Sequence, residues 1–199
     1  MIAVPVPIII VGKMGSGKTS VAECLERIYS TSSFDYKRVV TYTTRKPRPG
    51  ETEADYHFIT NEEFKKLVDD NLINEYHQFQ KGEELVQYGS SFDDYPLTIV
   101  DGKPQIKIVI LDPEGLHKAI KAFRPRNLSV IFLKVSDETL RKHLELRGDD
   151  PEEVDRRLAE EAESFQNVSQ YADLTISCEK TTVDEVANII DRYVHGNLI

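Results

Sequence analysis

The sequence predicts a three-layer α/β fold, in which helices cover a central parallel sheet and a small α+β insert interrupts the series. Short apolar or β-branched segments, which are typical of buried parallel strands, recur at residues 7–11, 38–43, 106–111, 128–135 and 174–177. Segments with helical apolar spacing alternate with them, as in chains built from strand–helix–strand units with right-handed crossovers. Between residues 41 and 100 short strands and turns replace this alternation, which predicts the insert.

A glycine-rich loop follows the first predicted strand. It consists of Gly12, Lys13, Met14, Gly15, Ser16, Gly17, Lys18 and Thr19, which fit the pattern G-x-x-x-x-G-K-[ST]. Apolar residues at i, i+3, i+4 and i+7, from Val21 to Ile28, predict a helix directly after it. Glycines let backbone N–H groups turn inward on a polyphosphate, and the helix N-terminus adds its positive dipole end. In this motif Lys18 contacts the β- and γ-phosphates and Thr19 binds Mg²⁺.

The alternative for residues 12–19 is a glycine-rich turn that binds nothing. At average amino-acid usage, the four fixed positions coincide by chance in a chain of this length with a probability of about 1%. The strand before the loop and the helix after it lower that chance further. The loop therefore predicts nucleotide binding.

A basic loop follows the strand predicted at residues 38–43. Residues 44–50 are TRKPRPG, with three cations and two prolines, so they cannot form a helix interior and predict a rigid exposed loop. It is either an ordinary solvated turn or a clamp that holds a second phosphate with guanidinium forks. The strongly acidic chain around it favours the clamp.

The remaining elements are predicted from caps and periodicity. In the insert, Tyr56–Thr60 is a strand candidate, a Thr60–Glu63 capping box begins a helix, and a turn at Gly82 separates two extended segments. Near the C-terminus a second capping box, at residues 182–185, begins a final helix whose sheet-facing residues are Val186, Ile189, Ile190 and Val194. The strand at 106–111 ends in an acidic segment, where such strands face the ligand crevice of a parallel sheet.

Two helices separated by a break are predicted between residues 136 and 165. The first runs from Ser136 to Gly148, and an Asp-Pro pair at residues 150–151 begins the second. The break is flanked by Arg147, Arg156 and Arg157. These arginines either close over a transferring phosphoryl group or form solvated pairs with neighbouring glutamates, and the sequence leaves both possibilities open.

Composition limits the function classes. With 199 residues, 40% hydrophobic and 30% charged, the chain fits one soluble globular domain. Its net charge of −9 argues against a nucleic-acid or membrane-surface binder, which needs basic faces.

Cys24 and Cys178 are far apart and form no C-x-x-C pair, so neither a disulfide scaffold nor a zinc site is indicated. No run reaches the ~18 apolar residues of a membrane span, and we expect a cytoplasmic protein.

The basic loop and the residues after it resemble the guanylate kinase family. Residues 43–50, TTRKPRPG, are followed by DYHF at residues 55–58, which is similar to the family pattern TTRxPRxGE...DYxF. Together with the phosphate loop, DPEG at residues 112–115 and Arg147-Gly148, the resemblance spans about residues 8–190. It implies a P-loop kinase that transfers the γ-phosphoryl group of ATP to GMP with the help of Mg²⁺.

The resemblance also implies roles for particular residues. The catalytic residues are Lys18, Arg45, Arg147 and Arg157, and ATP is held by residues 12–19. The GMP phosphate is held by Arg45, Arg48, Tyr56 and Tyr88, and guanine is read by Thr41, Glu75, Ser90 and Asp112. The domain is expected to comprise a core (1–40, 101–136 and 159–199), a GMP-binding insert (41–100) and a helical lid (137–158). The implied partners are nucleotides alone, and the protein is a monomer or a homodimer.

Some positions depart from the family pattern. Ile110 stands where an acidic residue that supports Mg²⁺ is usual, His143 where the first lid arginine is expected, and Ser177 where an asparagine is usual near adenine. The stretch between Glu75 and Tyr88 is longer than usual.

Two other functions stay open. One is a kinase of the same fold with another phosphorylated acceptor, against which the pair Glu75 and Asp112 argues, because guanine offers N1–H and N2–H₂ donors to carboxylates. The alternative for Glu75 is an exposed strand carboxylate that reads no base.

The second open function is a catalytically silent module that binds a phosphorylated partner, against which the intact Lys18 and Thr19 argue.

Overall fold

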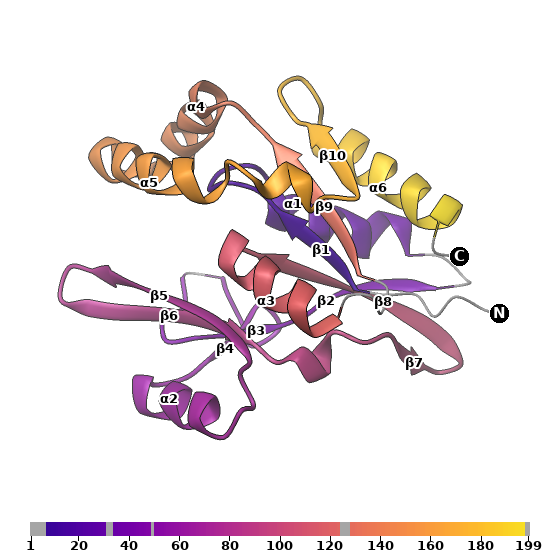
Figure 1. Cartoon of the computed structure of the whole chain (residues 1–199), viewed down its shortest axis with the longest axis horizontal. Helices are drawn as coiled ribbons and strands as arrows, with labels where there is room; N and C mark the ends of the chain where they lie inside the picture. The colour runs from indigo at the N-terminus through magenta and orange to yellow at the C-terminus, as the bar shows by residue number, and fades with distance from the viewer. Residues whose placement is uncertain (1–6, 31–33, 49, 124–127, 198–199) are drawn as a thin grey trace. The chain divides into compact units, whose positions relative to one another are not determined.

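A computed structural model describes residues 7–30, 34–48, 50–123 and 128–197. The chain divides into two compact units (Figure 1), which we call the core unit (Met1–Arg38 and Leu97–Ile199) and the insert unit (Val39–Pro96). Within the described ranges no helix is long and apolar enough to cross a membrane. Pro49 of the predicted basic loop lies outside the described residues.

The core unit is built on a mostly parallel sheet with strand order β10-β9-β1-β8-β2. Its strands are β1 (Ile8–Val11), β2 (Asp35–Arg38), β8 (Lys103–Leu111), β9 (Ser129–Lys134) and β10 (Leu174–Ser177), and β7 (Thr98–Val100) pairs antiparallel with β8. The apolar strand β1 is fully buried in the middle, with Ile10 between Ile110 of β8 and Ile131 of β9. The glycine loop therefore begins at the end of the central strand.

Helices cover both faces of this sheet (Figure 1). Helix α1 (Lys18–Cys24), its continuation η1 (Leu25–Tyr29) and α6 (Val183–Asn197) pack on the face that carries Ile8 and Ile10. Alternate residues of a strand face opposite sides, so Phe132 faces the other way, where its ring stacks on Phe165. Helix α3 (Pro113–Phe123) contacts β1 and β8. The structure confirms the predicted three-layer α/β class.

Helices α4 (Asp137–Arg147) and α5 (Pro151–Ser164) form a pair with its own apolar cluster. Gly148 ends α4 with a left-handed φ of 85°, and the Asp150 side chain caps the first turn of α5, as the sequence predicts. Leu144 and Leu158 are buried between the helices, and Met14 of the glycine loop packs against this cluster. The pair is therefore packed on the loop.

The insert unit contains a four-stranded sheet of order β4-β3-β6-β5. Its elements are β3 (Thr41–Thr43), β4 (Tyr56–Phe58), α2 (Asn61–Asp69), β5 (Glu75–Lys81) and β6 (Glu84–Ser90). The capping box of Thr60 and Glu63 begins α2 as predicted, and α2 buries Phe64 completely. Strands β5 and β6 form a long antiparallel hairpin, which pairs Glu75 with Ser90.

Three predictions about the elements are wrong. The strand predicted at residues 38–43 is two strands in different sheets, because β2 ends at Arg38 and β3 begins at Thr41. The β-branched pair between them, residues 39–40, conceals the break between the two strands. Ile28 is 46% exposed, because the helix widens into a π-helix at Leu25–Tyr29 and the 3.6-residue spacing no longer holds there. Ile189 is 38% exposed at the edge of the apolar stripe of α6.

We predict that Gly89→Ala destabilises the insert unit. A Cβ at this position in β6 would lie 2.7 Å from Ile73 Cγ2 and 2.9 Å from both Phe64 Cζ and the backbone oxygen of Glu75. Relieving that contact requires the β5–β6 pairing to shift, so the free energy of unfolding should fall by about 1–3 kcal/mol. Urea unfolding followed by circular dichroism measures this change.

The matched control is Gly196→Ala in α6, where an added Cβ meets nothing within 4 Å. Because alanine is the better helix former, this change should leave stability unchanged or raise it by up to about 1 kcal/mol. Equal effects at the two positions would contradict the packing argument.

Candidate active site

The glycine loop joins β1 to α1 and is shaped by close backbone approaches. A Cβ on Gly12 would lie 2.9 Å from the backbone oxygen of Leu133 and 2.5 Å from Ser16 Oγ, so only glycine fits there. Gly17, the N-cap of α1, has a left-handed φ of 87°. Ser16 is buried, and its hydroxyl has no hydrogen-bond partner among the described residues. An unpaired buried hydroxyl in a loop of inward N–H groups fits a bound anion.

Lys18, the first residue of α1, lies over the loop. Its Nζ donates hydrogen bonds to the backbone oxygens of Gly12, at 2.7 Å, and Lys13, at 3.0 Å. Burial lowers the pKa of Lys18 to about 8, and the neighbouring positive charges of Arg157 and Arg147 lower it as well.

Two carboxylates oppose this shift. Glu161 and Asp112 raise the pKa of Lys18, Glu161 more strongly. In the core unit, two of the other predicted catalytic residues, Arg147 and Arg157, therefore lie within electrostatic range of Lys18.

Polar contacts join the α4–α5 pair to the loop. Lys13 Nζ lies 2.6 Å from Asp137 Oδ1, and the backbone N–H of Met14 donates to Glu161 Oε2 at 2.9 Å. His143 Nδ1 lies 3.0 Å from the backbone oxygen of Gly15, which can only accept, so this nitrogen carries the proton. His143, which stands where the first lid arginine is expected, thus contacts the glycine loop.

In the insert unit, Arg45 is the centre of a hydrogen-bonded cluster. Its Nη1 and Nη2 donate to the two carboxylate oxygens of Glu51, both at 2.9 Å, and its Nε donates to the Tyr88 hydroxyl at 2.8 Å. Its guanidinium carbon lies 5.3 Å from the ring centre of Tyr56. Burial opposes the charge of Arg45, but the hydrogen bonds outweigh it and raise its pKa, and the same fork lowers the pKa of Glu51.

The remaining predicted phosphate residue, Arg48, is more loosely held. Its side chain is exposed, and its backbone N–H donates to Glu51 Oε2 at 2.6 Å. The structure therefore groups Arg45, Tyr56 and Tyr88, and places the backbone of Arg48 beside them through Glu51.

A second cluster in the insert unit surrounds Glu75, which is only 4% exposed. The Ser90 hydroxyl lies 3.2 Å from Glu75 Oε2 and 2.7 Å from the Tyr95 hydroxyl, and both Ser90 and Tyr95 are fully buried. The alternative of an exposed strand carboxylate is therefore wrong. Thr41 lies at the start of β3, opposite Tyr56 of β4.

Comparison with known proteins decides the family. The guanylate kinase family model matches residues 5–196. The chain belongs to the guanylate kinase family. It is 31% identical over 188 residues to the guanylate kinase of Wolbachia pipientis wMel, covering 89% of this chain and 85% of that protein. It is 35% identical over 190 residues to the guanylate kinase of Prochlorococcus marinus subsp. pastoris, covering 92% and 95%.

A solved structure supports the same fold. The guanylate kinase from Anaplasma phagocytophilum aligns with a TM-score of 0.69 at 22% identity, over 99% of this chain and 88% of that chain. The guanylate kinase fold is thus common to both chains.

Asp112, the predicted guanine reader, and Thr19, the predicted metal ligand, both lie in the core unit. Asp112 follows β8, and its Oδ1 accepts a hydrogen bond from the backbone N–H of Gly115 at 2.7 Å, which caps α3. Thr19 is exposed in the first turn of α1. In the described part of the chain no group of three or more His, Cys, Asp or Glu side chains forms a metal site.

Sequence reasoning missed Glu161 and Tyr95. Glu161 lies on α5, and helical spacing presents it as one of several solvated glutamates. Tyr95 follows no periodic pattern and stands between two aspartates and Pro96, so no local signal indicates its burial. Glu51 had a local signal, since it completes the basic-loop motif three residues after Arg48.

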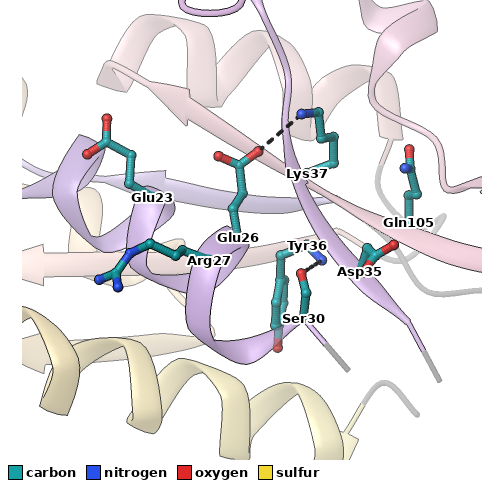
Figure 2. Close-up of a pocket in the computed structure, with 8 residues that line it drawn as sticks. All are labelled: Glu23, Glu26, Arg27, Ser30, Asp35, Tyr36, Lys37 and Gln105. Carbon is teal, nitrogen blue, oxygen red and sulfur yellow. Dashed lines mark hydrogen bonds and ion pairs between the residues drawn. The ribbon is translucent and has the colours of Figure 1, made fainter. Parts of the chain in front are cut away.

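An open hollow of about 500 Å³ lies elsewhere on the core unit (Figure 2). It is lined by Glu23, Glu26, Arg27, Ser30, Asp35, Tyr36, Lys37 and Gln105. These residues come from the end of α1–η1 remote from the glycine loop and from the neighbouring strands, and none is a predicted site residue. In it Lys37 pairs with Glu26 (Figure 2). Glu23 and Asp35 pair with Arg38 and Lys103, which are not among the lining residues.

We predict that Lys18 titrates near pH 8 in the protein without nucleotide. Lysines labelled with ¹³C at Cε report this pKa by NMR, and the signal that disappears in Lys18→Met identifies the residue. Because the charge of Glu161 raises the pKa of Lys18, Glu161→Gln should lower it further. A Lys18 signal that titrates near 10.5, with the exposed lysines, would show that the side chain is solvated.

Proposed function

We propose that this chain transfers the γ-phosphoryl group of ATP to GMP, giving ADP and GDP. The observation that carries this proposal is the match of the guanylate kinase family model to residues 5–196, which contain an intact phosphate loop with an unpaired buried hydroxyl. The roles of single residues below are part of the proposal.

The donor half of the reaction belongs to the core unit. The N–H groups of residues 12–19 hold the ATP phosphates, and Lys18 leaves the backbone oxygens of Gly12 and Lys13 for the β- and γ-phosphates. Contact with phosphate raises the pKa of Lys18 again, so the lysine binds as a cation. Arg147 and Arg157, which act electrostatically on Lys18, neutralise charge that grows on the transferred group.

Mg²⁺ fits this site as a companion of ATP. When bound, it would supply Lewis-acid stabilisation of the negative charge on the phosphates. The exposed Thr19 hydroxyl is the ligand that this chain offers, which suits an ion that keeps several waters and is bound largely through substrate phosphates. Water and phosphate oxygens would then take the place of the acidic residue that usually supports Mg²⁺ at the position of Ile110.

The residues proposed for the acceptor half lie in the insert unit, except for Asp112, which lies in the core unit. Arg45, Arg48, Tyr56 and Tyr88 hold the GMP phosphate, and Arg45 is kept charged and oriented by its fork with Glu51. Arg45 is also the catalytic residue of this half.

Guanine is recognised by buried acceptors. The Glu75 carboxylate accepts from the N1–H and N2–H₂ groups of guanine, and Ser90, held by Tyr95, orients that carboxylate. Thr41 and Asp112 complete the reading. Adenine offers no donors on the corresponding edge, and a site that must hydrogen-bond its substrate rejects such an analogue by about 10⁴–10⁵.

We further propose that residues 137–158 act as a lid over the reacting phosphates and that the insert unit binds GMP, without Thr98–Val100 of the predicted segment 41–100, which pair with β8 in the core unit. Exclusion of water by such a lid protects the phosphoryl group from hydrolysis. A cytoplasmic location and a monomeric or homodimeric state stay predictions.

A coupled assay for ADP formation tests the function. Wild-type protein receives ATP, Mg²⁺ and GMP, dGMP, AMP, CMP or UMP in turn, and GMP should be turned over far faster than AMP, CMP and UMP. Lys18→Ala is the matched negative control, with kcat expected about 10²–10³ lower because one preorganised cation is lost. Preference for another acceptor would replace GMP in the proposal, and turnover of none would overturn it.

We predict that Glu75→Gln lowers the preference for GMP over AMP. The amide keeps the size of the carboxylate but replaces one acceptor with a donor that faces guanine N–H groups. The ratio of kcat/KM for GMP to that for AMP should fall by at least tenfold. Glu84→Gln, at an exposed position of the same hairpin, is the charge-matched control. An unchanged ratio in Glu75→Gln would show that this carboxylate does not read the base.

A further inference from the structure

A carboxylate of the protein itself occupies the glycine loop. Glu161 Oε2 accepts a hydrogen bond from the backbone N–H of Met14 at 2.9 Å, although the two residues are 147 positions apart. The charge of Glu161 also opposes the lowering of the Lys18 pKa more strongly than any other group. Glu161 is half-buried on α5 and therefore faces the loop and not open solvent.

This contact uses a group that a phosphate would need. Inward N–H groups of such a loop bind anions, and a carboxylate oxygen is an acceptor of the same kind as a phosphate oxygen. Met14 N–H has one proton to donate, so a phosphate oxygen and Glu161 compete for it. Two negative groups at the loop also repel each other in a partly buried setting, where water screens them weakly.

Contacts of the α4–α5 pair hold the helix that carries Glu161 against the glycine loop. The apolar cluster of the α4–α5 pair includes Leu158, one helical turn before Glu161, and Met14 packs against that cluster. The contacts of Lys13 with Asp137 and of His143 with Gly15 hold the same helix pair on the loop. The Glu161 carboxylate can thus leave the Met14 N–H by a change of side-chain rotamer, while the Lys13–Asp137 and His143–Gly15 contacts persist.

We propose that Glu161 is an internal occupant of the phosphate loop, which the donor nucleotide must displace, so that this residue lowers the affinity of the protein for ATP. This inference rests on the proposed function, because it takes residues 12–19 as the donor site. Glu161 then sets how much ATP is needed before the loop is filled. If Glu161 instead orients Met14 and Lys18 for ATP, removing its carboxylate should weaken ATP binding.

Isothermal titration calorimetry with a non-hydrolysable ATP analogue and Mg²⁺ decides between the two. Wild type, Glu161→Gln and Glu161→Ala are compared with Glu163→Gln, a charge-matched control at an exposed position of the same helix. Removing the occupant should lower the Kd for the analogue about tenfold in both Glu161 variants. Glu163→Gln should stay within about twofold of wild type, because an exposed charge is screened.

Adenosine provides the second readout. It lacks phosphates and does not compete for Met14 N–H, so its Kd should be the same in wild type and Glu161→Gln. Thermal unfolding of each variant checks that the fold is kept. Tighter binding of the analogue with unchanged adenosine binding supports the inference.

Other outcomes overturn it. An unchanged or raised Kd for the analogue in the Glu161 variants would show that the carboxylate does not compete with phosphate, and so would failure of every variant to bind. Equal tightening of adenosine would show a general change in the site. The GMP assay is independent: no GMP turnover alongside tighter analogue binding would refute the proposed function and leave this inference standing.

Discussion

The backbone donors of the glycine loop require an acceptor, and much of the core unit is arranged around that requirement. The loop begins where the buried central strand β1 ends, and at Gly12 the backbone comes too close to Leu133 to allow a side chain. Within the loop the Ser16 hydroxyl is buried without a hydrogen-bond partner among the described residues, and backbone N–H groups of such loops bind anions. Lys18 shares its protons with backbone oxygens, and Glu161 accepts from Met14.

Internal carboxylates accompany the predicted phosphate-binding groups in both units. Glu161 faces the loop of the core unit, and Glu51 fills the guanidinium fork of Arg45 in the insert unit. Isolated cations and N–H groups are costly to bury, so a chain of net charge −9 provides local partners for them. The two carboxylates have different effects. Glu51 keeps Arg45 charged, whereas Glu161 accepts a hydrogen bond from the Met14 N–H, which the proposal assigns to a phosphate of the ligand.

Local signals predicted most of the fold. Caps predicted the beginnings of α2, α5 and α6, and Gly148 predicted the end of α4, because these signals act between residues three or four positions apart. The break between β2 and β3 at residues 39–40 was missed, since no glycine, proline or polar cluster interrupts the β-branched run. Ile28 was misplaced because a π-helix turn leaves no mark in a pattern of 3.6 residues.

The sequence by itself determined the glycine loop, the basic loop and the family, because each depends on residues that are adjacent along the chain. Only the tertiary structure decided that Glu75 is buried beside Ser90 and Tyr95, that the pKa of Lys18 falls to about 8, and that Glu161 reaches Met14. Burial and electrostatic contact depend on which distant segments pack together, and short-range patterns do not encode that packing.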